Sequence, residues 1–187
     1  MKSPEVVSRV ANKPIISDSV VGAMEYYVDI SFSEAMDTTV VPFVSLNAAV
    51  SISSDVQYNV PASVYLDSFT YRAYFQIVDL GTEVDPVHIT VDFGEDFAGN
   101  SQLQDDFQNF TTLDTKNPTV ISLTANDYIL DQWGQNFDVL AIYDEPMRTD
   151  IYPQMAFSPL VPVPLPKVDS AWINGTTHEL YYELQGV

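Results

Sequence analysis

The side chains of this 187-residue chain that could do chemistry are mostly oxygen ligands. Carboxylates and amides cluster first at Asp92, Glu95, Asp96 and Asn100, and again at Asp114 and Asn117. Ca²⁺ takes about six to eight oxygen ligands of this kind, so calcium is the cofactor that the two clusters predict. An alternative remains open, because the chain carries 26 acidic against 7 basic residues. An acidic surface that keeps molecules apart in solution explains the same clusters without a metal.

Groups suited to catalysis are scarce. Cysteine is absent, which removes disulfides, thiolate metal sites and cysteine nucleophiles together. The two histidines, His88 and His178, are both expected at the surface of strands rather than as catalytic bases. No nucleophile elbow, phosphate-binding loop or His-Glu-x-x-His motif occurs. The sequence therefore predicts a protein that is not an enzyme.

The net charge of −19 argues against two classes of partner. Nucleic-acid binding requires Lys and Arg to neutralise phosphates, and anionic lipid headgroups would be repelled in the same way. Membrane insertion is not expected either, because the longest apolar run is about five residues (40–44) where a span needs about 20. The first residues lead into no hydrophobic stretch, so the chain is expected to be cytoplasmic or an internal piece of a longer exported protein.

Hydrophobic residues alternate at period two in several places, as they do in half-buried strands. Three such stripes occur, at residues 26–32, 71–77 and 87–93. Twelve prolines interrupt most longer windows, and β-branched and aromatic residues are abundant. The sequence predicts an all-β protein.

One segment of the chain recurs 111 residues later. This shift places Phe-Ser-Glu-Ala-Met-Asp (residues 32–37) over Tyr-Asp-Glu-Pro-Met-Arg (residues 143–148). It also places the stripe at 26–32 over the apolar positions of residues 137–143. Self-similarity at a fixed spacing is typical of repeated structural units.

Two more segments align at similar shifts. A shift of 107 places residues 73–77 over 180–184, and a shift of 104 places Pro14-Ile15-Ile16 over Pro118-Thr119-Val120. Because the four segments keep their order and their strand face, we interpret the chain as two copies of one β-unit.

The repeat predicts the domain boundaries. Residues 14–115 have the length of a seven-strand sandwich of about 100 residues, and residues 116–187 form the second unit. Residues 1–13 are assigned to an N-terminal tail or to the last strand of a preceding repeat. Residues 81–112 of the first unit have no counterpart in the second. The second unit is therefore either truncated or completed by another segment. An open apolar edge favours aggregation, and a strand from another molecule would cover it.

Three short motifs resemble a known family. Phe-Ser-Glu-Ala-Met-Asp after an alternating strand is similar to the signature of bacterial Ig-like repeats, which occur in S-layer proteins and surface adhesins. Residues 95–100 resemble the Asp-x-Ala-Gly-Asn turn of that family, and residues 114–120 resemble the start of a new repeat. The second unit departs from the pattern, since Arg148 replaces the Asp and the Ala-Gly-Asn turn is absent.

This resemblance implies tandem Ig-like β-sandwiches with a non-catalytic, structural or adhesive function. It further implies an extracellular or cell-surface location in bacteria and neighbouring repeats of the same or another chain as partners. Surface glycans or a host protein are further expected partners.

A carbohydrate-binding β-sandwich, or an accessory domain of a secreted enzyme, is the alternative function. Trp133 and Trp172 are its candidate ligand-binding residues, because flat aromatic rings can stack on sugars. Trp172 precedes an Asn-Gly pair that predicts a hairpin turn. The equivalent position of the first unit is Tyr65, which favours a packing function for Trp172 and leaves Trp133 as the better candidate for contact with a sugar.

Overall fold

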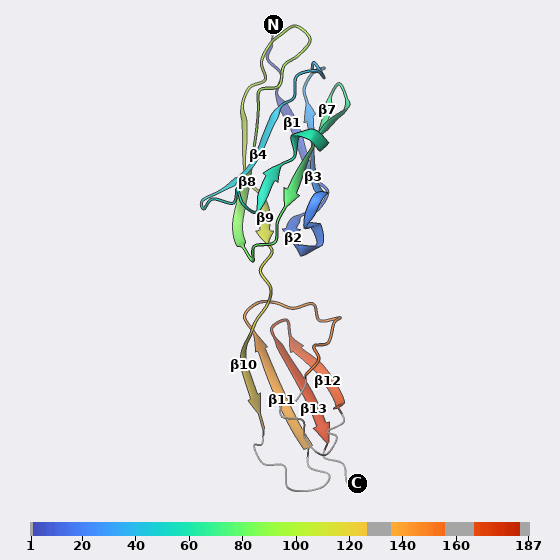
Figure 1. The fold of residues 1–187 in the computed structure, drawn as a ribbon, viewed down its shortest axis with the longest axis vertical. Helices are drawn as coiled ribbons and strands as arrows, with labels where there is room; N and C mark the ends of the chain where they lie inside the picture. The colour runs from blue at the N-terminus through green and yellow to red at the C-terminus, as the bar shows by residue number, and fades with distance from the viewer. Residues whose placement is uncertain (1, 127–135, 156–166, 184–187) are drawn as a thin grey trace. The chain divides into compact units, whose positions relative to one another are not determined.

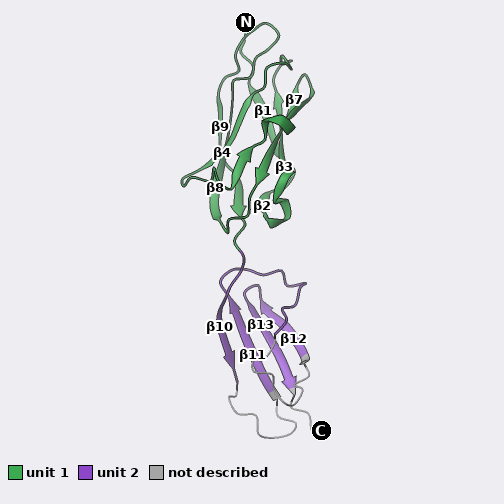
Figure 2. Ribbon diagram, viewed as in Figure 1, with its two compact units in different colours: residues 1–116 green, residues 117–187 purple. Residues whose placement is uncertain are grey.

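A computed structural model describes residues 2–126, 136–155 and 167–183. The chain divides into two compact units, residues 1–116 and 117–187, which are described separately (Figure 2). Within the described ranges the regular structure consists of strands and two short 3₁₀ turns, η1 (Asp18–Val20) and η2 (Val60–Ala62). The all-β prediction is confirmed. No helix in these ranges is long and apolar enough to cross a membrane.

The first sheet of unit 1 is antiparallel and has the order β1-β3-β7-β5, with β6 also paired to β7 (Figure 1). Its strands are β1 (Val6–Ala11), β3 (Gly22–Phe32), β5 (Val56–Tyr58), β6 (Val64–Asp67) and β7 (Thr70–Ile77).

The second sheet of unit 1 has the order β2-β9-β8-β4. It contains β2 (Ile15–Ser17), β4 (Phe43–Ala48), β8 (Glu83–Asp92) and β9 (Asp105–Asp114). The short strand β2 is parallel to β9, and the other pairs are antiparallel. With β1, β3, β5, β6 and β7 in one sheet and β2, β4, β8 and β9 in the other, unit 1 is a two-sheet β-sandwich.

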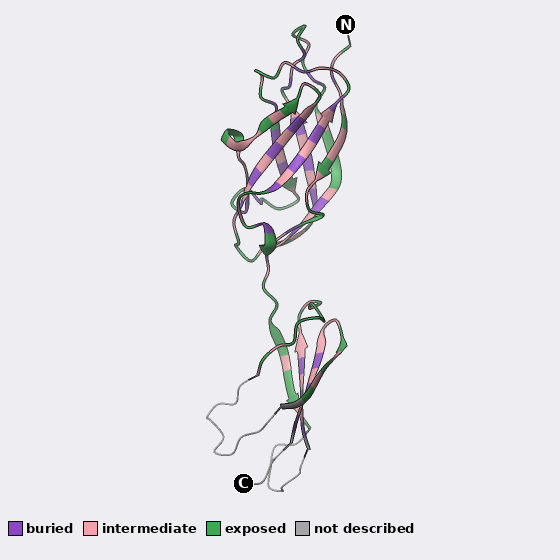
Figure 3. Cartoon of the chain, turned by 90° about the vertical axis from the view of Figure 1, so that its right-hand side faces the viewer, coloured by how far each residue is buried: buried purple, intermediate pink, exposed green. Residues whose placement is uncertain are grey.

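The core of unit 1 comes from the inward stripes of both sheets. Strand β3 contributes Tyr26, Val28, Ile30 and Phe32, and all four are buried together with residues from β7, β8 and β9 in one hydrophobic cluster. Figure 3 shows the resulting alternation of buried and half-buried positions along the strands. The third predicted stripe ends earlier than expected, because β8 ends at Asp92 and the next residue, Phe93, is 68% exposed.

The described part of unit 2 contains one antiparallel sheet in the order β10-β11-β13-β12. Its strands are β10 (Val120–Ala125), β11 (Asn136–Tyr143), β12 (Lys167–Asn174) and β13 (Thr177–Glu183). The buried cluster includes Phe137, Val139, Leu180 and Tyr182. The predicted Asn-Gly turn joins β12 to β13, and the Thr176 N–H donates to Asn174 Oδ1 at 2.8 Å.

The central strand pairs of the two units have the same register. In unit 1, β3 and β7 pair Val28 with Ala73, and in unit 2, β11 and β13 pair Val139 with Leu180. These positions differ by 111 and 107 residues, which are the two shifts found in the sequence.

The first strands of the two units are related by a different shift from the 104 residues that the sequence suggested. Val6 pairs with Phe32, and Val120 pairs with Tyr143, each followed by an irregularity two residues later. Val120 therefore corresponds to Val6, with a shift of 114, whereas Ile16 lies in β2 of the other sheet. The sequence offers two prolines ahead of β-branched residues, Pro4 and Pro14, and the comparison matched the second of them.

Strand β1 pairs with β3 and belongs to unit 1, whereas the sequence pattern predicted an N-terminal tail or the last strand of a preceding repeat at residues 1–13 and a first unit that begins at residue 14. The reason is Arg9, which interrupts the apolar alternation. Arg9 pairs with Ile30 across the sheet, its guanidinium forms an ion pair with Asp105, and it lies 4.9 Å from the centroid of the Phe107 ring. A charge on the inner face of an edge strand conceals the strand from a hydrophobicity pattern.

Candidate functional site

The first group of predicted calcium ligands lies in the loop between β8 and β9 (residues 93–104, the β8–β9 loop). Both carboxylate oxygens of Asp96 accept hydrogen bonds from the loop itself. Oδ1 accepts the backbone N–H groups of Ala98 and Asn100 at 2.8 Å each, and Oδ2 accepts the Asn100 side-chain amide at 2.6 Å. Gly99 has a φ of +79°, so the predicted glycine turn is confirmed.

The remaining predicted ligands are dispersed. Asp92 accepts the N–H of Phe93 at 2.8 Å, and Glu95 forms an isolated bridge with Ser101. Asp114 belongs to unit 1 and Asn117 to unit 2. Among the described residues, no three His, Asp or Glu side chains are close enough together to hold a metal ion.

A different set of carboxylates gathers at one end of unit 1. Burial, followed by the negative charges of Asp79 and Asp114, raises the pKa of Asp18. These three residues come from η1, from the segment after β7 and from the end of β9. The three carboxylates are therefore near enough to repel one another, and they form part of the acidic surface of unit 1.

Calcium binding remains a prediction, and a thermal melt tests it. At a concentration about 100 times its Kd, one bound ion adds about 2.7 kcal/mol of stability. For a domain of this size such a gain raises Tm by roughly 10 °C. The melt is compared in calcium, in magnesium and in chelator, and equal Tm values in all three would exclude the site.

The stability of the β8–β9 loop should depend on pH through Asp96. Hydrogen bonds from Asn100, first from its side chain and then from its backbone, lower the pKa of Asp96 below the ordinary value of 3.8. A lowered pKa in the folded state means that the carboxylate stabilises the fold above its unfolded pKa. That contribution is lost as the pH falls through the folded pKa. An NMR titration of Asp96 from about pH 5 to about pH 2 measures the pKa in the folded state and the loss of the loop's stability as the pH falls.

The Asn100→Ala variant is the matched test of this cause. We expect the Asp96 pKa to rise part of the way to its ordinary value, because the side-chain bond is lost while the backbone N–H groups of positions 98 and 100 still donate to Asp96 Oδ1. An unchanged Asp96 pKa in this variant would show that Asn100 does not hold the carboxylate.

The β8–β9 loop covers Met36, the methionine of the Phe-Ser-Glu-Ala-Met-Asp motif. Met36 bridges to Asp96, and the N–H of the next residue, Asp37, donates to the Glu95 carbonyl at 2.8 Å. Gly94 lies directly against the thioether, since a Cβ at this position would be 2.8 Å from Met36 Cε. Met36 is fully buried.

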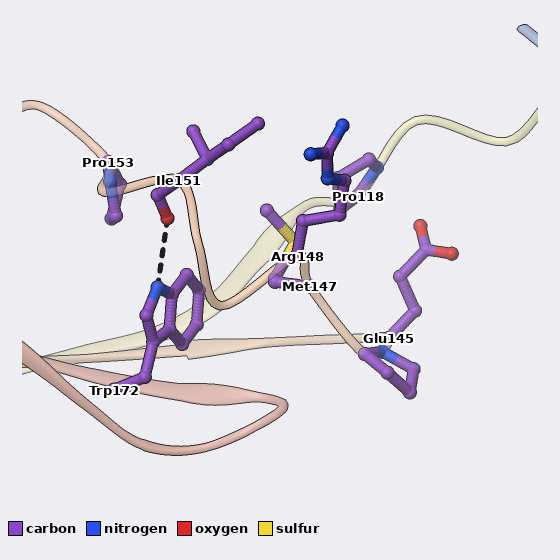
Figure 4. A pocket seen from close by; sticks show the side chains of 8 residues that line it. Pro118, Glu145, Met147, Arg148, Ile151, Pro153 and Trp172 are labelled. Carbon is purple, nitrogen blue, oxygen red and sulfur yellow. Dashed lines mark hydrogen bonds between the residues drawn. The ribbon is translucent and has the colours of Figure 1, made fainter. Parts of the chain in front are cut away.

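The equivalent methionine of unit 2 has the same backbone bond but a different environment. The Met147 N–H donates to the Gly175 carbonyl at 2.6 Å, as the Met36 N–H donates to Ser68 at 2.8 Å. Met147 is only half-buried, and it lines an apolar pocket of about 330 Å³ (Figure 4). We call this the end pocket, and its other lining residues are Pro118, Glu145, Pro146, Arg148, Ile151, Pro153 and Trp172.

Trp172 is held in place by its own unit. Its Nε1–H donates to the Ile151 carbonyl at 2.9 Å (Figure 4), and its ring lies 5.7 Å from that of Tyr143. In unit 1 the Tyr65 hydroxyl donates to the Val40 carbonyl at 3.3 Å, which is the equivalent bond. Trp133, the other candidate ligand-binding residue, lies outside the described residues.

His178 is buried in unit 2, so its expected surface position is wrong. It is fully buried, pairs with Ala141 on the inner face of the sheet, and lies 4.8 Å from the Trp172 ring. The reason is that His178 occupies the position of Tyr71, whose ring lies 4.8 Å from that of Tyr65. His88 is partly exposed, and its Nδ1 accepts the N–H of Asn109 at 3.0 Å.

Comparison with other proteins gives no further assignment. No protein-family model matches the chain, and no curated protein and no solved structure matches it. The function therefore has to be inferred from the geometry of the two units.

Proposed function

We propose that the chain is a non-catalytic, structural or adhesive Ig-like repeat module of a bacterial cell-surface or secreted protein. The strongest support for this proposal is that two backbone features of unit 1 occur again in unit 2. Both units have the same register between their central strands and the same hydrogen bond from the motif methionine. Repeated structural units that carry no repeated catalytic group are typical of proteins that form extended structures and bind partners along their surface. The expected partners are neighbouring repeats of the same or another chain.

The strand pairing of unit 1 suits a load-bearing function. Strand β2 near the start of the unit is parallel to β9 at its end, and Thr111 of β9 donates to the Pro14 carbonyl at 2.9 Å. The Arg9–Asp105 ion pair is a second link between the first and last strands. A force applied to the two ends of the unit would load these bonds together in shear rather than one after another.

Single-molecule pulling on the full chain tests this proposal. We expect unit 1 to unfold at a distinct force peak and to release roughly 39 nm of chain, less the end-to-end length of the folded unit, at about 3.4 Å per residue. Arg9→Gln should lower the peak force, because it removes a bond between the first and last strands. The matched control is Arg72→Gln, which removes an ion pair to Asp29 between β3 and β7 of the same sheet. Unfolding without a force peak would contradict a load-bearing function.

Carbohydrate binding is the second candidate, and the aromatic surface of Trp172 in the end pocket favours it. The indole N–H already donates to Ile151, so only the ring face is left for a sugar. Binding to a glycan array that is lost in Trp172→Ala but kept in Ile173→Ala would support this function. Ile173 is adjacent and 57% exposed, but it does not line the pocket.

A further inference from the structure

Residues that line the end pocket have buried counterparts in unit 1. With the shifts of 114 and 111 established above, Pro118, Met147 and Pro153 correspond to Pro4, Met36 and Pro42. All three residues of unit 1 are buried, whereas Pro118 is exposed and Met147 and Pro153 are half-buried. The end pocket is therefore the position at which unit 1 has an additional covering segment.

That covering segment is the β8–β9 loop. Its Gly94 packs against Met36, its Glu95 carbonyl accepts the Asp37 N–H, and its Leu103 N–H donates to the Pro4 carbonyl at 3.1 Å. The buried Gln102 fixes the loop to the sheet, since its side-chain amide donates to the Val91 carbonyl at 3.1 Å. A Cβ at residue 94 would lie 2.8 Å from both Met36 Cε and Gln102 Oε1, so a side chain there would have to displace these two groups.

The charge next to the methionine differs between the two units. Unit 1 has Asp37 beside the acidic pair Glu95 and Asp96, whereas unit 2 has Arg148 at the position of Asp37. The Arg148 side chain is 75% exposed. Its guanidinium forms an ion pair with the exposed Asp150 at 2.6 Å. An exposed ion pair contributes little stability, so Arg148 can change partners at small cost. The pocket lining thus combines apolar residues with one acidic residue, Glu145, and one cation, Arg148, and Arg148 is the group that can pair with an acidic loop.

We propose that the end pocket binds an acidic, glycine-containing loop of a β-hairpin, of the kind that residues 93–104 form over Met36. The glycine of the loop packs on Met147, a loop carbonyl accepts the backbone N–H of Arg148, and a loop carboxylate forms an ion pair with its guanidinium. This inference names the chemistry of a partner and does not depend on the surface location of the protein.

A hairpin peptide is the direct probe. A synthetic peptide of residues 83–114 is titrated into the full chain carrying Trp133→Phe, so that Trp172 is the single tryptophan. We expect a saturable change in Trp172 fluorescence. A peptide with Gly94→Val should bind more weakly, because in unit 1 a Cβ at this position would lie 2.8 Å from the methionine Cε, and a loop seated in the same way on Met147 would meet the same contact.

Charge reversal distinguishes the loop from other occupants. Arg148→Glu should weaken binding of the peptide roughly tenfold, and a peptide with Glu95→Lys should recover most of the loss. Ile173→Glu, next to Trp172 but outside the pocket, should leave binding unchanged.

Three results would overturn the proposal. They are the absence of saturable binding, equal binding of the Gly94→Val peptide, and self-association of the chain in sedimentation that the peptide does not reduce. The last would assign the pocket to a second copy of the chain instead.

Discussion

Replacing Met36 by alanine is expected to destabilise unit 1 by about 2–5 kcal/mol. The side chain is fully buried between the β8–β9 loop and the sheet, and Gly94 lies against its methyl group. Alanine would leave a cavity that the loop cannot fill, because Asp96 and Gln102 fix the loop from both sides. Chemical denaturation followed by tyrosine circular dichroism measures the loss.

Met147→Ala is the matched control for this prediction. The equivalent methionine is half-buried beside an open pocket, so its removal should cost less than about 1 kcal/mol. Equal losses in the two variants would show that the β8–β9 loop does not determine the environment of the methionine. They would also remove the basis for the proposed binding of a loop in the end pocket.

Phe75→Ala should have a similar or larger effect, about 3–5 kcal/mol. Phe75 is 1% exposed at the centre of unit 1, and its ring lies 6.1 Å from that of Tyr26 and 5.9 Å from that of Tyr58. Such aromatic pairs add stability beyond the apolar area that they bury. Phe97→Ala is the control, because Phe97 is 70% exposed and should change stability by less than about 0.5 kcal/mol.

The same variant tests whether the two units unfold independently. Both tryptophans of the chain belong to unit 2, so their fluorescence follows that unit alone. We expect the fluorescence transition of Phe75→Ala to match the unaltered chain, while the far-ultraviolet transition moves to lower denaturant. A shift of both transitions would show that unit 1 stabilises unit 2.

The central strands were predictable from the sequence because each carries one unbroken inward stripe. The stripe from Tyr26 to Phe32 in β3 and its counterpart in β11 carry an apolar residue at every second position, and most of these residues are buried as expected. The edge strand β1 was not predictable in the same way, because Arg9 is an inward residue whose charge is neutralised by Asp105. Only the tertiary structure brings this partner, 96 residues away, within reach.

The candidate site was predicted less well than the fold. Asp96 and Asn100 were selected for their ligand chemistry, but the Asp96 carboxylate already accepts hydrogen bonds from two loop N–H groups and from the Asn100 side-chain amide. The end pocket was not anticipated, because Pro118, Met147 and Trp172 are ordinary core residues whose exposure depends on what covers them. The recurrence of the methionine motif was the available signal, together with the change from Asp37 to Arg148.

The parallel pairing of β2 with β9 also has a consequence for biosynthesis. Thr111 and Pro14 are 97 residues apart in sequence, so the second sheet of unit 1 is completed only after nearly the whole unit has left the ribosome. Contacts of such long sequence separation slow folding. Until then the apolar stripe of β3 is exposed, and chaperones that recognise extended hydrophobic segments are expected to bind the nascent chain during this interval.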